Sequence, residues 1–232
     1  GKNVYNNEEI SAVVSQLKKT TQMSKSVKTF EKKISKLFDK NYALMVNSGT
    51  SAITLALDVL NIKKNSEIIV PSLNFGTAIS CIIRANLKPI FVDIDRNTLQ
   101  IDCNLIEKKI SKKTKALMIP NLIGNLPELD RLKNLCKKHK LYLIEDSADT
   151  LGSKFNKKSS GFYSDISICS FYGSHVISCA GNGGILCFND KKFLQRATVL
   201  RSWGRSSSIL KQSENINQRL NIKLKGFEYD KK

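Results

Sequence analysis

The chain has 232 residues, which is enough for one large domain or two small ones. Its 38 Lys and Arg residues outnumber its 20 Asp and Glu residues and give a net charge of +18, but it has no run of about 18 apolar residues that would span a membrane. Because the lysines occur as scattered pairs and not as one basic stripe with interleaved aromatic residues, we expect no nucleic-acid partner and no membrane contact.

Apolar and polar segments alternate at intervals typical of β-α-β units. In chain order, the pattern predicts helices over residues 8–17 and 27–38, a strand over 42–46, a helix over 52–60, a strand over 67–70, a helix over 77–85, a strand over 89–92, a helix over 105–110, a strand over 116–119, a helix over 129–139, strands over 141–144, 166–171 and 184–188, and a helix over 192–201. Short continuous runs such as IIV, IFV and LYLI indicate strands buried on both faces. We therefore expect an α/β fold with three layers, α/β/α, around a mostly parallel sheet. The polar tail after Trp203 predicts an incomplete element.

The six cysteines include no C-x-x-C pair, and several lie in apolar, strand-like runs where cysteine behaves as a small buried hydrophobe. This usage predicts a reducing compartment, hence the cytoplasm, and no disulfide framework. The start of the chain lacks the pattern of a secretory signal. The first residue is Gly1 rather than Met, so we expect the chain to be part of a longer protein.

A polar turn, Ser48-Gly49-Thr50-Ser51, stands between a predicted strand and a predicted helix. Glycine lets the backbone approach an anion closely, and the start of a helix offers free N–H groups and a positive dipole end. The two residues after Gly49 add hydroxyl donors. The turn therefore predicts an anion site, with an ordinary helix N-cap as the alternative.

Two further motifs follow predicted strands. Glu145-Asp146 ends the LYLI strand, and ligands of open α/β sheets bind at the carboxyl ends of strands, where a carboxylate can pair with a protonated ring nitrogen. The alternative is an ordinary loop carboxylate. His175 lies in the loop after the next predicted strand and is a candidate acid or base, although a lone histidine is usually structural or solvated.

Taken together, the order and spacing of these motifs resemble those of the DegT/DnrJ/EryC1/StrS family of sugar aminotransferases and dehydratases, which are fold type I pyridoxal-phosphate enzymes. The resemblance covers essentially the whole chain and is carried by Val27-x-x-Phe30-Glu31, Asn47-Ser48-Gly49-Thr50-Ser51-Ala52, Pro71-Ser72, Glu145-Asp146-Ser147-Ala148-Asp149, Gly161-x-x-Ser164-Asp165, Ser170-Phe171 and Gly183-Gly184. It implies that residues 1–232 form the large, aspartate-aminotransferase-like cofactor domain, with the N-terminal helical segment included and the smaller C-terminal domain absent.

The resemblance also implies where pyridoxal or pyridoxamine phosphate would bind. Backbone and hydroxyl groups of Gly49, Thr50 and Ser51 would hold the phosphate, and Ser170 would add a donor. No metal ligand is implied.

Four residues would contact the cofactor ring by the same resemblance. Asp146 would pair with the protonated pyridine nitrogen, which keeps the ring an electron sink, and Ala148 would pack beneath it. Phe75 would stack on the ring, unless it is a core aromatic residue. Asp149, where aminotransferases of the family usually have Gln, would contact the ring hydroxyl.

One position departs from the aminotransferases. Their Schiff-base lysine lies five residues after the serine of Ser-Phe, and counting from Ser170 that position is His175. An imidazole cannot form the covalent link that a lysine amine forms with the cofactor, but it can move a proton near neutral pH. The 3-dehydratases of keto-deoxy nucleotide sugars share this substitution, and the segment 121–125 (NLIGN) is also more similar to them. By resemblance, pyridoxamine phosphate would condense with the C4 ketone, and His175 would remove a proton so that the C3 hydroxyl leaves.

One branch of these dehydratases carries an iron–sulfur cluster, with its cysteines shortly after a Trp-Gly-Arg motif. Here Trp203-Gly204-Arg205 is followed by three serines, and no cysteine follows Cys187. Because iron–sulfur ligation needs thiolates, the resemblance favours the other branch, which takes its amino group from an amino acid such as L-glutamate. We expect a lyase acting on a nucleotide-diphosphate 4-keto-6-deoxy sugar, a homodimer with shared active sites, and a diffuse positive charge that attracts the diphosphate.

Two other hypotheses stay open. The chain could be an aminotransferase relative that has lost its lysine and only binds cofactor or sugar, or, from its charge alone, a nucleic-acid binder. One departure from the family's sequence concerns the first of these hypotheses. The glycine-rich segment Ala180–Gly184 lies one residue further along the chain than the Gly-Glu-Gly-Gly segment of the family, which changes the loop around His175.

Overall fold

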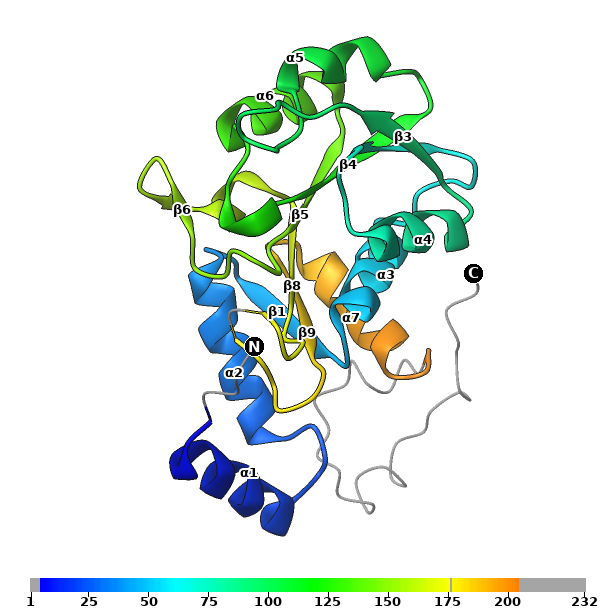
Figure 1. Ribbon diagram of the computed structural model, residues 1–232. Helices are drawn as coiled ribbons and strands as arrows, with labels where there is room; N and C mark the ends of the chain where they lie inside the picture. Colours follow the sequence, from blue (N-terminus) through cyan, green and yellow to red (C-terminus); the bar gives the residue numbers. More distant parts are fainter. Residues whose placement is uncertain (1–4, 176, 205–232) are drawn as a thin grey trace, which may run out of the picture.

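The structure, a computed structural model, describes residues 5–175 and 177–204. Its centre is a seven-stranded sheet with the strand order β1-β9-β8-β5-β4-β2-β3 (Figure 1). The strands of this sheet are β1 (Tyr42–Val46), β2 (Glu67–Pro71), β3 (Lys88–Val92), β4 (Thr114–Pro120), β5 (Tyr142–Asp146), β8 (Ile166–Ser170) and β9 (Gly184–Phe188). A separate two-stranded ribbon consists of β6 (Lys154–Phe155) and β7 (Lys158–Ser159).

The sheet is mostly parallel, as predicted. The pairings that join β3, β2, β4, β5 and β8 are all parallel, whereas β9 is antiparallel to both of its neighbours, β8 and β1. It follows that β1 runs in the same direction as β8. The carboxyl ends of six of the seven strands therefore meet at one edge of the sheet, the edge where ligands bind in open α/β folds.

Helices cover both faces of the sheet and complete the predicted three layers. The helices are α1 (Asn7–Lys19), α2 (Lys25–Leu37), α3 (Gly49–Leu60), α4 (Gly76–Arg84), α5 (Cys103–Ile106), α6 (Leu129–His139) and α7 (Lys191–Arg201), with 3₁₀ turns η1 (Glu107–Lys109), η2 (Leu122–Gly124) and η3 (Ser160–Tyr163). One core lies between the sheet and α3, α4 and α7, and two others lie between the opposite face and α2, α5 and α6.

The strand β2 shows why the sheet is buried on both faces. Ile68 and Val70 belong to the core under α3 and α4, and Ile69 between them belongs to the core on the other face; all three are 0% exposed. Successive side chains of a strand point to opposite faces, so a doubly covered strand needs an apolar residue at every position. The continuous IIV run correctly predicted this environment.

Two predicted helix boundaries were wrong. Helix α3 begins at Gly49 rather than Ala52, because the Ser48 hydroxyl caps it by accepting a hydrogen bond from the Ser51 N–H at 3.1 Å. The helix expected over residues 105–110 is instead α5 followed by η1. It starts earlier because the Asp102 carboxylate accepts a hydrogen bond from the Asn104 N–H at 2.8 Å.

Helix α1 is amphipathic, as predicted, but its apolar face is not covered by the described residues. Ile10, Val13, Val14 and Leu17 are all exposed, and no residue of α1 is buried. Figure 1 shows this helix at the lower left, apart from the sheet. The three cores around the sheet therefore form without it.

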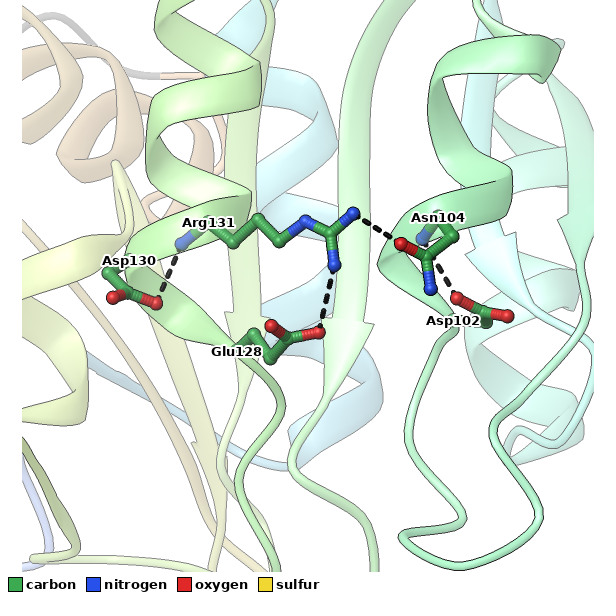
Figure 2. A network of polar contacts seen from close by, with 5 residues as sticks. All are labelled: Asp102, Asn104, Glu128, Asp130 and Arg131. Atoms are coloured by element: carbon green, nitrogen blue, oxygen red, sulfur yellow. Dashed lines mark hydrogen bonds and ion pairs between the residues drawn. The ribbon is translucent and has the colours of Figure 1, made fainter.

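A polar network fastens α6 to α5 on the outer surface (Figure 2). The guanidinium of Arg131 donates to Asn104 Oδ1 at 2.6 Å and pairs with the Glu128 carboxylate at 3.3 Å. The side chains of this ion pair are 42% and 61% exposed, so we expect it to contribute less than about 1 kcal/mol to stability. The cores, not this network, hold the layers together.

All six cysteines are free; Cys179 is exposed and the other five are buried. Across residues 5–175 and 177–204, no helix has both the length and the apolar character needed to cross a membrane. The tail after Gly204, with Arg205 and the serines that follow it, lies outside the described residues, as does Gly1.

Candidate active site

A cavity of about 580 Å³ opens at the edge of the sheet where the parallel strands end. Its volume lies within the range of about 300–1,000 Å³ that is usual for small-molecule sites. Its walls come from the segments that follow β1, β2, β4, β5 and β8. Eight of the nine predicted site residues line it: Gly49, Thr50, Phe75, Asp146, Ala148, Asp149, Ser170 and His175.

The first turn of α3 forms one end of this cavity. A side chain at Gly49 would place its Cβ 2.7 Å from Ser170 Cβ and 3.1 Å from Ser170 Oγ, so the helix start and Ser170 touch only because the residue is glycine. Thr50, in the same turn, also lines the cavity. Free N–H groups of a helix start beside two hydroxyls form a cradle suited to a phosphate.

Ser51 is the predicted site residue that does not line the cavity. Its N–H donates to Ser48 Oγ, and its hydroxyl accepts from the Ser48 hydroxyl, both at 3.1 Å. The Ser51 side chain is therefore hydrogen-bonded to Ser48, the residue that caps α3. A role for Ser51 in phosphate binding stays a prediction.

Replacing Gly49 with alanine is expected to weaken the binding of pyridoxal phosphate by about tenfold or more. The added Cβ overlaps Ser170, and such overpacking typically costs about 1–3 kcal/mol. Gly76→Ala is the matched control, because a Cβ there meets nothing within 4 Å. Binding can be measured by equilibrium dialysis, with circular dichroism to check folding. Equal affinity in Gly49→Ala and Gly76→Ala would contradict the cradle.

The Asp146 carboxylate ends β5 and lines the cavity. Burial raises its pKa to about 6; the hydrogen bond from the Ala148 N–H opposes this shift, and the negative charges of Asp149 and Glu145 add to it. A buried carboxylate with a raised pKa is stabilised by a cationic partner, such as a protonated ring nitrogen.

Glu145, the other half of the predicted pair, points away from the cavity. It is 2% exposed, and its Oε1 accepts from Asn121 Nδ2 at 2.9 Å and from Ser147 Oγ at 2.6 Å, while Oε2 accepts from Ser167 Oγ at 2.9 Å. Adjacent strand residues face opposite sides, so only one of the two carboxylates can line the cavity.

The other predicted ring contacts line the same cavity as Asp146. Phe75 is 70% exposed and stands just before α4, so the alternative that it is a core aromatic residue is wrong. Ala148 lines the cavity beside it. Asp149 Oδ2 accepts a hydrogen bond from the Ile123 N–H at 3.3 Å, which ties the segment after β5 to the segment after β4.

His175 follows β8 and lines the same cavity. Its backbone N–H donates to the Tyr172 carbonyl at 3.0 Å, and the two side-chain rings meet edge to face with centroids 6.0 Å apart. The ring nitrogen Nδ1 is buried and has no hydrogen-bond partner among the described residues. The imidazole is therefore held against Tyr172 at the wall of the cavity.

Asn74, Asn121 and Tyr172 are among the cavity residues that were not predicted as site residues. Asn74 Nδ2 and Asn121 Oδ1 are buried and lack hydrogen-bond partners in the described part of the chain. Both residues come soon after a predicted strand that ends in proline, so the rule that ligands bind at strand ends was the available signal.

These features fit a ligand with a phosphate at one end and a protonated ring nitrogen. The Gly49 cradle suits the phosphate, and Asp146 suits the nitrogen. A second, more open groove of about 530 Å³ lies between α1 and α2, but none of its lining residues has a buried unpaired side-chain atom. The cavity at the sheet edge is therefore the candidate site.

Comparisons with known proteins identify the family of the chain. The sequence pattern of the DegT/DnrJ/EryC1/StrS aminotransferase family matches residues 4–228. The chain is 37% identical to a GDP-perosamine synthase of Escherichia coli O157:H7 over 178 residues, which cover 77% of this chain and 49% of that protein. It is 30% identical to the GDP-4-keto-6-deoxy-D-mannose 3-dehydratase of Escherichia coli O55:H7 over 199 residues, which cover 83% of this chain and 51% of that protein.

A solved structure is similar over nearly the whole chain. It is GDP-4-keto-6-deoxymannose-3-dehydratase with a trapped PLP-glutamate geminal diamine, 27% identical, with a TM-score of 0.85 over 98% of this chain and 63% of that one. This chain spans about half the length of the curated relatives it matches.

Proposed function

The chain belongs to the DegT/DnrJ/EryC1/StrS aminotransferase family and has the fold of its fold type I enzymes, and from this premise we propose that it is the cofactor-binding domain of a nucleotide-sugar 3-dehydratase. The enzyme would use pyridoxal or pyridoxamine phosphate to remove the C3 hydroxyl of a nucleotide-diphosphate 4-keto-6-deoxy sugar. The observation that carries this proposal is His175 in the cavity, at the position of the Schiff-base lysine. No lysine is among the described residues that line the cavity.

Different residues of the cavity would bind different parts of the cofactor. The first turn of α3 and Ser170 would hold the phosphate, and Asp146 would keep a proton on the ring nitrogen. Phe75 and Ala148 would hold the ring in place. When bound, the cofactor supplies an electron sink for the charge that develops on the sugar.

His175 would act as the base. His175 lines the cavity, so its imidazole would be within reach to take a proton from the carbon that bears the cofactor's amine. Its protonated form could then donate to the departing C3 hydroxyl. A lysine at this position would instead bind the cofactor covalently.

We also propose an amino donor and a partner subunit for the enzyme. L-Glutamate would supply the amino group, in keeping with the glutamate trapped in the solved relative, and the three serines that follow Trp203-Gly204-Arg205, where the cluster branch has cysteines, support a reaction without an iron–sulfur cluster. Phe75 and Tyr172, which line the cavity, are 70% and 57% exposed, and Ile123, which follows the lining residue Leu122, is 70% exposed. Their exposure supports a homodimer in which a second copy covers the site. We also propose a cytoplasmic location and no nucleic-acid or membrane partner.

One observation favours a second candidate. The 37% identity to a GDP-perosamine synthase supports an aminotransferase relative that has lost its lysine and binds cofactor or sugar without turnover. His175 favours the dehydratase, because a binding protein has no need of an unpaired imidazole in its cavity.

The test is an assay of the complete gene product that contains this chain. It is given pyridoxal phosphate, L-glutamate and a panel of nucleotide-linked 4-keto-6-deoxy sugars, and products are identified by mass spectrometry. A dehydratase removes one oxygen from the sugar, oxidises glutamate to 2-oxoglutarate and releases ammonia. A product that retains the nitrogen at C4 would show an aminotransferase, and binding without any product would support the second candidate.

A further inference from the structure

Strand β1 is the outermost strand of the sheet, and side chains bind both backbone groups of one of its residues. Among the described residues β1 pairs with β9 alone, so its outer side has no strand partner. On that side the Met45 N–H donates to Glu31 Oε1 at 2.9 Å, and the Met45 carbonyl accepts from Arg201 Nη1 at 3.0 Å. Arg201 Nη1 also donates to Glu31 Oε1 at 3.0 Å. We call Glu31 and Arg201 the β1 clasp.

The β1 clasp reaches the strand from both faces of the sheet. Glu31 comes from α2, which packs on one face, and Arg201 is the last residue of α7, which packs on the other face with α3. The two side chains are 15% and 18% exposed, and Arg201 Nε is buried. An outermost strand normally presents unpaired N–H and carbonyl groups. At Met45, side chains of two helices take the place of the missing strand.

Stability alone is a weak explanation for a largely buried ion pair. Removing two charges from water costs about as much free energy as their attraction returns, and apolar residues of similar volume often hold a fold equally well. What Glu31 and Arg201 supply, and apolar residues cannot, is an acceptor and a donor for the backbone of Met45. The clasp therefore fixes the place of β1.

The place of β1 matters because the strand leads directly into the first turn of α3. Met45 comes three residues before Ser48, the N-cap of α3. The fit at this turn is tight, since a Cβ added at Gly49 would lie 2.7 Å from Ser170 Cβ, and one added at Gly184 would overlap the Ser48 carbonyl. Even a small shift of β1 would therefore move the free N–H groups of α3 relative to Ser170.

We propose that Glu31 and Arg201 are positioning residues for the phosphate cradle. By binding the outer side of β1 at Met45, they hold the first turn of α3 in place against Ser170. Neither side chain is among the described residues that line the cavity, so both act through the backbone of β1. This inference rests on the cofactor site of the proposed function and deepens it, because it assigns a role in cofactor binding to two charged residues outside the cavity.

The test uses the complete gene product and the double variant Glu31→Leu with Arg201→Met. Apolar side chains replace the ion pair, so the midpoint of urea unfolding is expected to stay close to the wild-type value, while both backbone groups of Met45 lose their partners. The dissociation constant of pyridoxamine phosphate, measured by its fluorescence, is expected to rise about tenfold. In the cofactor-free protein, amide hydrogen exchange should become faster in residues 46–51 and stay unchanged in residues 146–149.

Two control variants separate positioning from general stability. Glu31→Gln keeps an oxygen that can accept from the Met45 N–H, so its affinity for pyridoxamine phosphate is expected to stay within about twofold of the wild-type value. Glu67→Ala removes a carboxylate that accepts from Ser111 and Thr114 at the start of β2, the end of the strand away from the cavity. This variant is expected to leave both cofactor affinity and exchange in residues 46–51 unchanged.

The outcomes separate the clasp from the proposed function. Wild-type affinity and exchange in the double variant, or an equal loss of affinity in Glu67→Ala, would overturn the clasp. A loss in Glu31→Gln as large as in the double variant would also overturn it, because the charges and not the bonds to Met45 would then matter. If the double variant does not fold, Arg201→Met alone removes the donor to the Met45 carbonyl and is judged by the same exchange measurement. A protein that binds pyridoxamine phosphate through the clasp but dehydrates no sugar would overturn the proposed function alone.

Discussion

His175→Lys is expected to trap pyridoxal phosphate covalently at residue 175, where the wild-type protein traps none. A lysine amine at this position forms the imine that imidazole cannot form, and borohydride reduces that imine to a stable adduct. The measurement is peptide mass spectrometry after reduction, since it separates residue 175 from the many surface lysines. A modified surface lysine without modification at residue 175 would show that the alignment of His175 with the Schiff-base lysine is wrong.

The base role of His175 calls for a different substitution. His175→Asn keeps a polar side chain but removes proton transfer, which typically contributes about 10²–10⁴-fold to a rate. We expect dehydration by the complete gene product to slow by this factor, while the affinity for pyridoxamine phosphate stays within about twofold of the wild-type value. A wild-type rate in this variant would assign the base to another residue.

Asp146→Asn is expected to stabilise the cofactor-free protein near neutral pH and to impair its use of the cofactor. The folded-state pKa of Asp146 is about 6, above the value of 3.8 for a free side chain, so the folded state loses stability as pH rises between these values and the ionised carboxylate is destabilising above pH 6. A shift of about two units corresponds to about 3 kcal/mol. Because the residue is still partly exposed, we expect a gain of about 1–2 kcal/mol.

The measurement is urea unfolding of the wild-type protein, Asp146→Asn and the control Asp93→Asn at several pH values. The gain should be present above about pH 6 and vanish below about pH 4, where Asp146 is protonated in both the folded and the unfolded state. Cofactor titrations should show weaker binding in Asp146→Asn, because the ring nitrogen loses its charged partner. A variant that is less stable than the wild-type protein at pH 7 would mean that the carboxylate is not strained by burial.

Much of the fold was predictable because its signals are local. The run at Ile68–Val70 is apolar at every position, as expected of a strand covered on both faces, whereas the start of α3 at Gly49 was placed three residues too late because the cap by Ser48 was left as one of two readings. The antiparallel insertion of β9 was not predictable from such patterns, because the pairing of Gly184 with Val46 depends on residues far apart in the chain.

Some residues of the site were likewise predictable from local sequence signals, and others were not. Gly49, Asp146 and His175 were found because each follows a predicted strand within a recognisable motif. Asn121 was missed as a site residue, although it stands in a quoted segment, because its orientation depends on Glu145 fixing its amide, a contact that spans 24 residues and appears only in three dimensions. The exposure of Ile10 on α1 was also not predictable, because the spacing of apolar residues shows that one face of a helix is apolar but does not show which residues cover it.

The position of β1 has a consequence for synthesis on the ribosome. This strand leads into the phosphate cradle, and within residues 5–175 and 177–204 its only sheet partner is β9, which begins at Gly184. At about 5–20 residues per second, roughly 7–30 s pass between translation of the two strands. During that time β1 has no sheet partner, and unpaired strand edges are where misassembly begins. A chaperone that shields this emerging strand would therefore increase the yield of native protein. A ligand that binds the completed cradle would stabilise only those chains in which β1 has paired with β9.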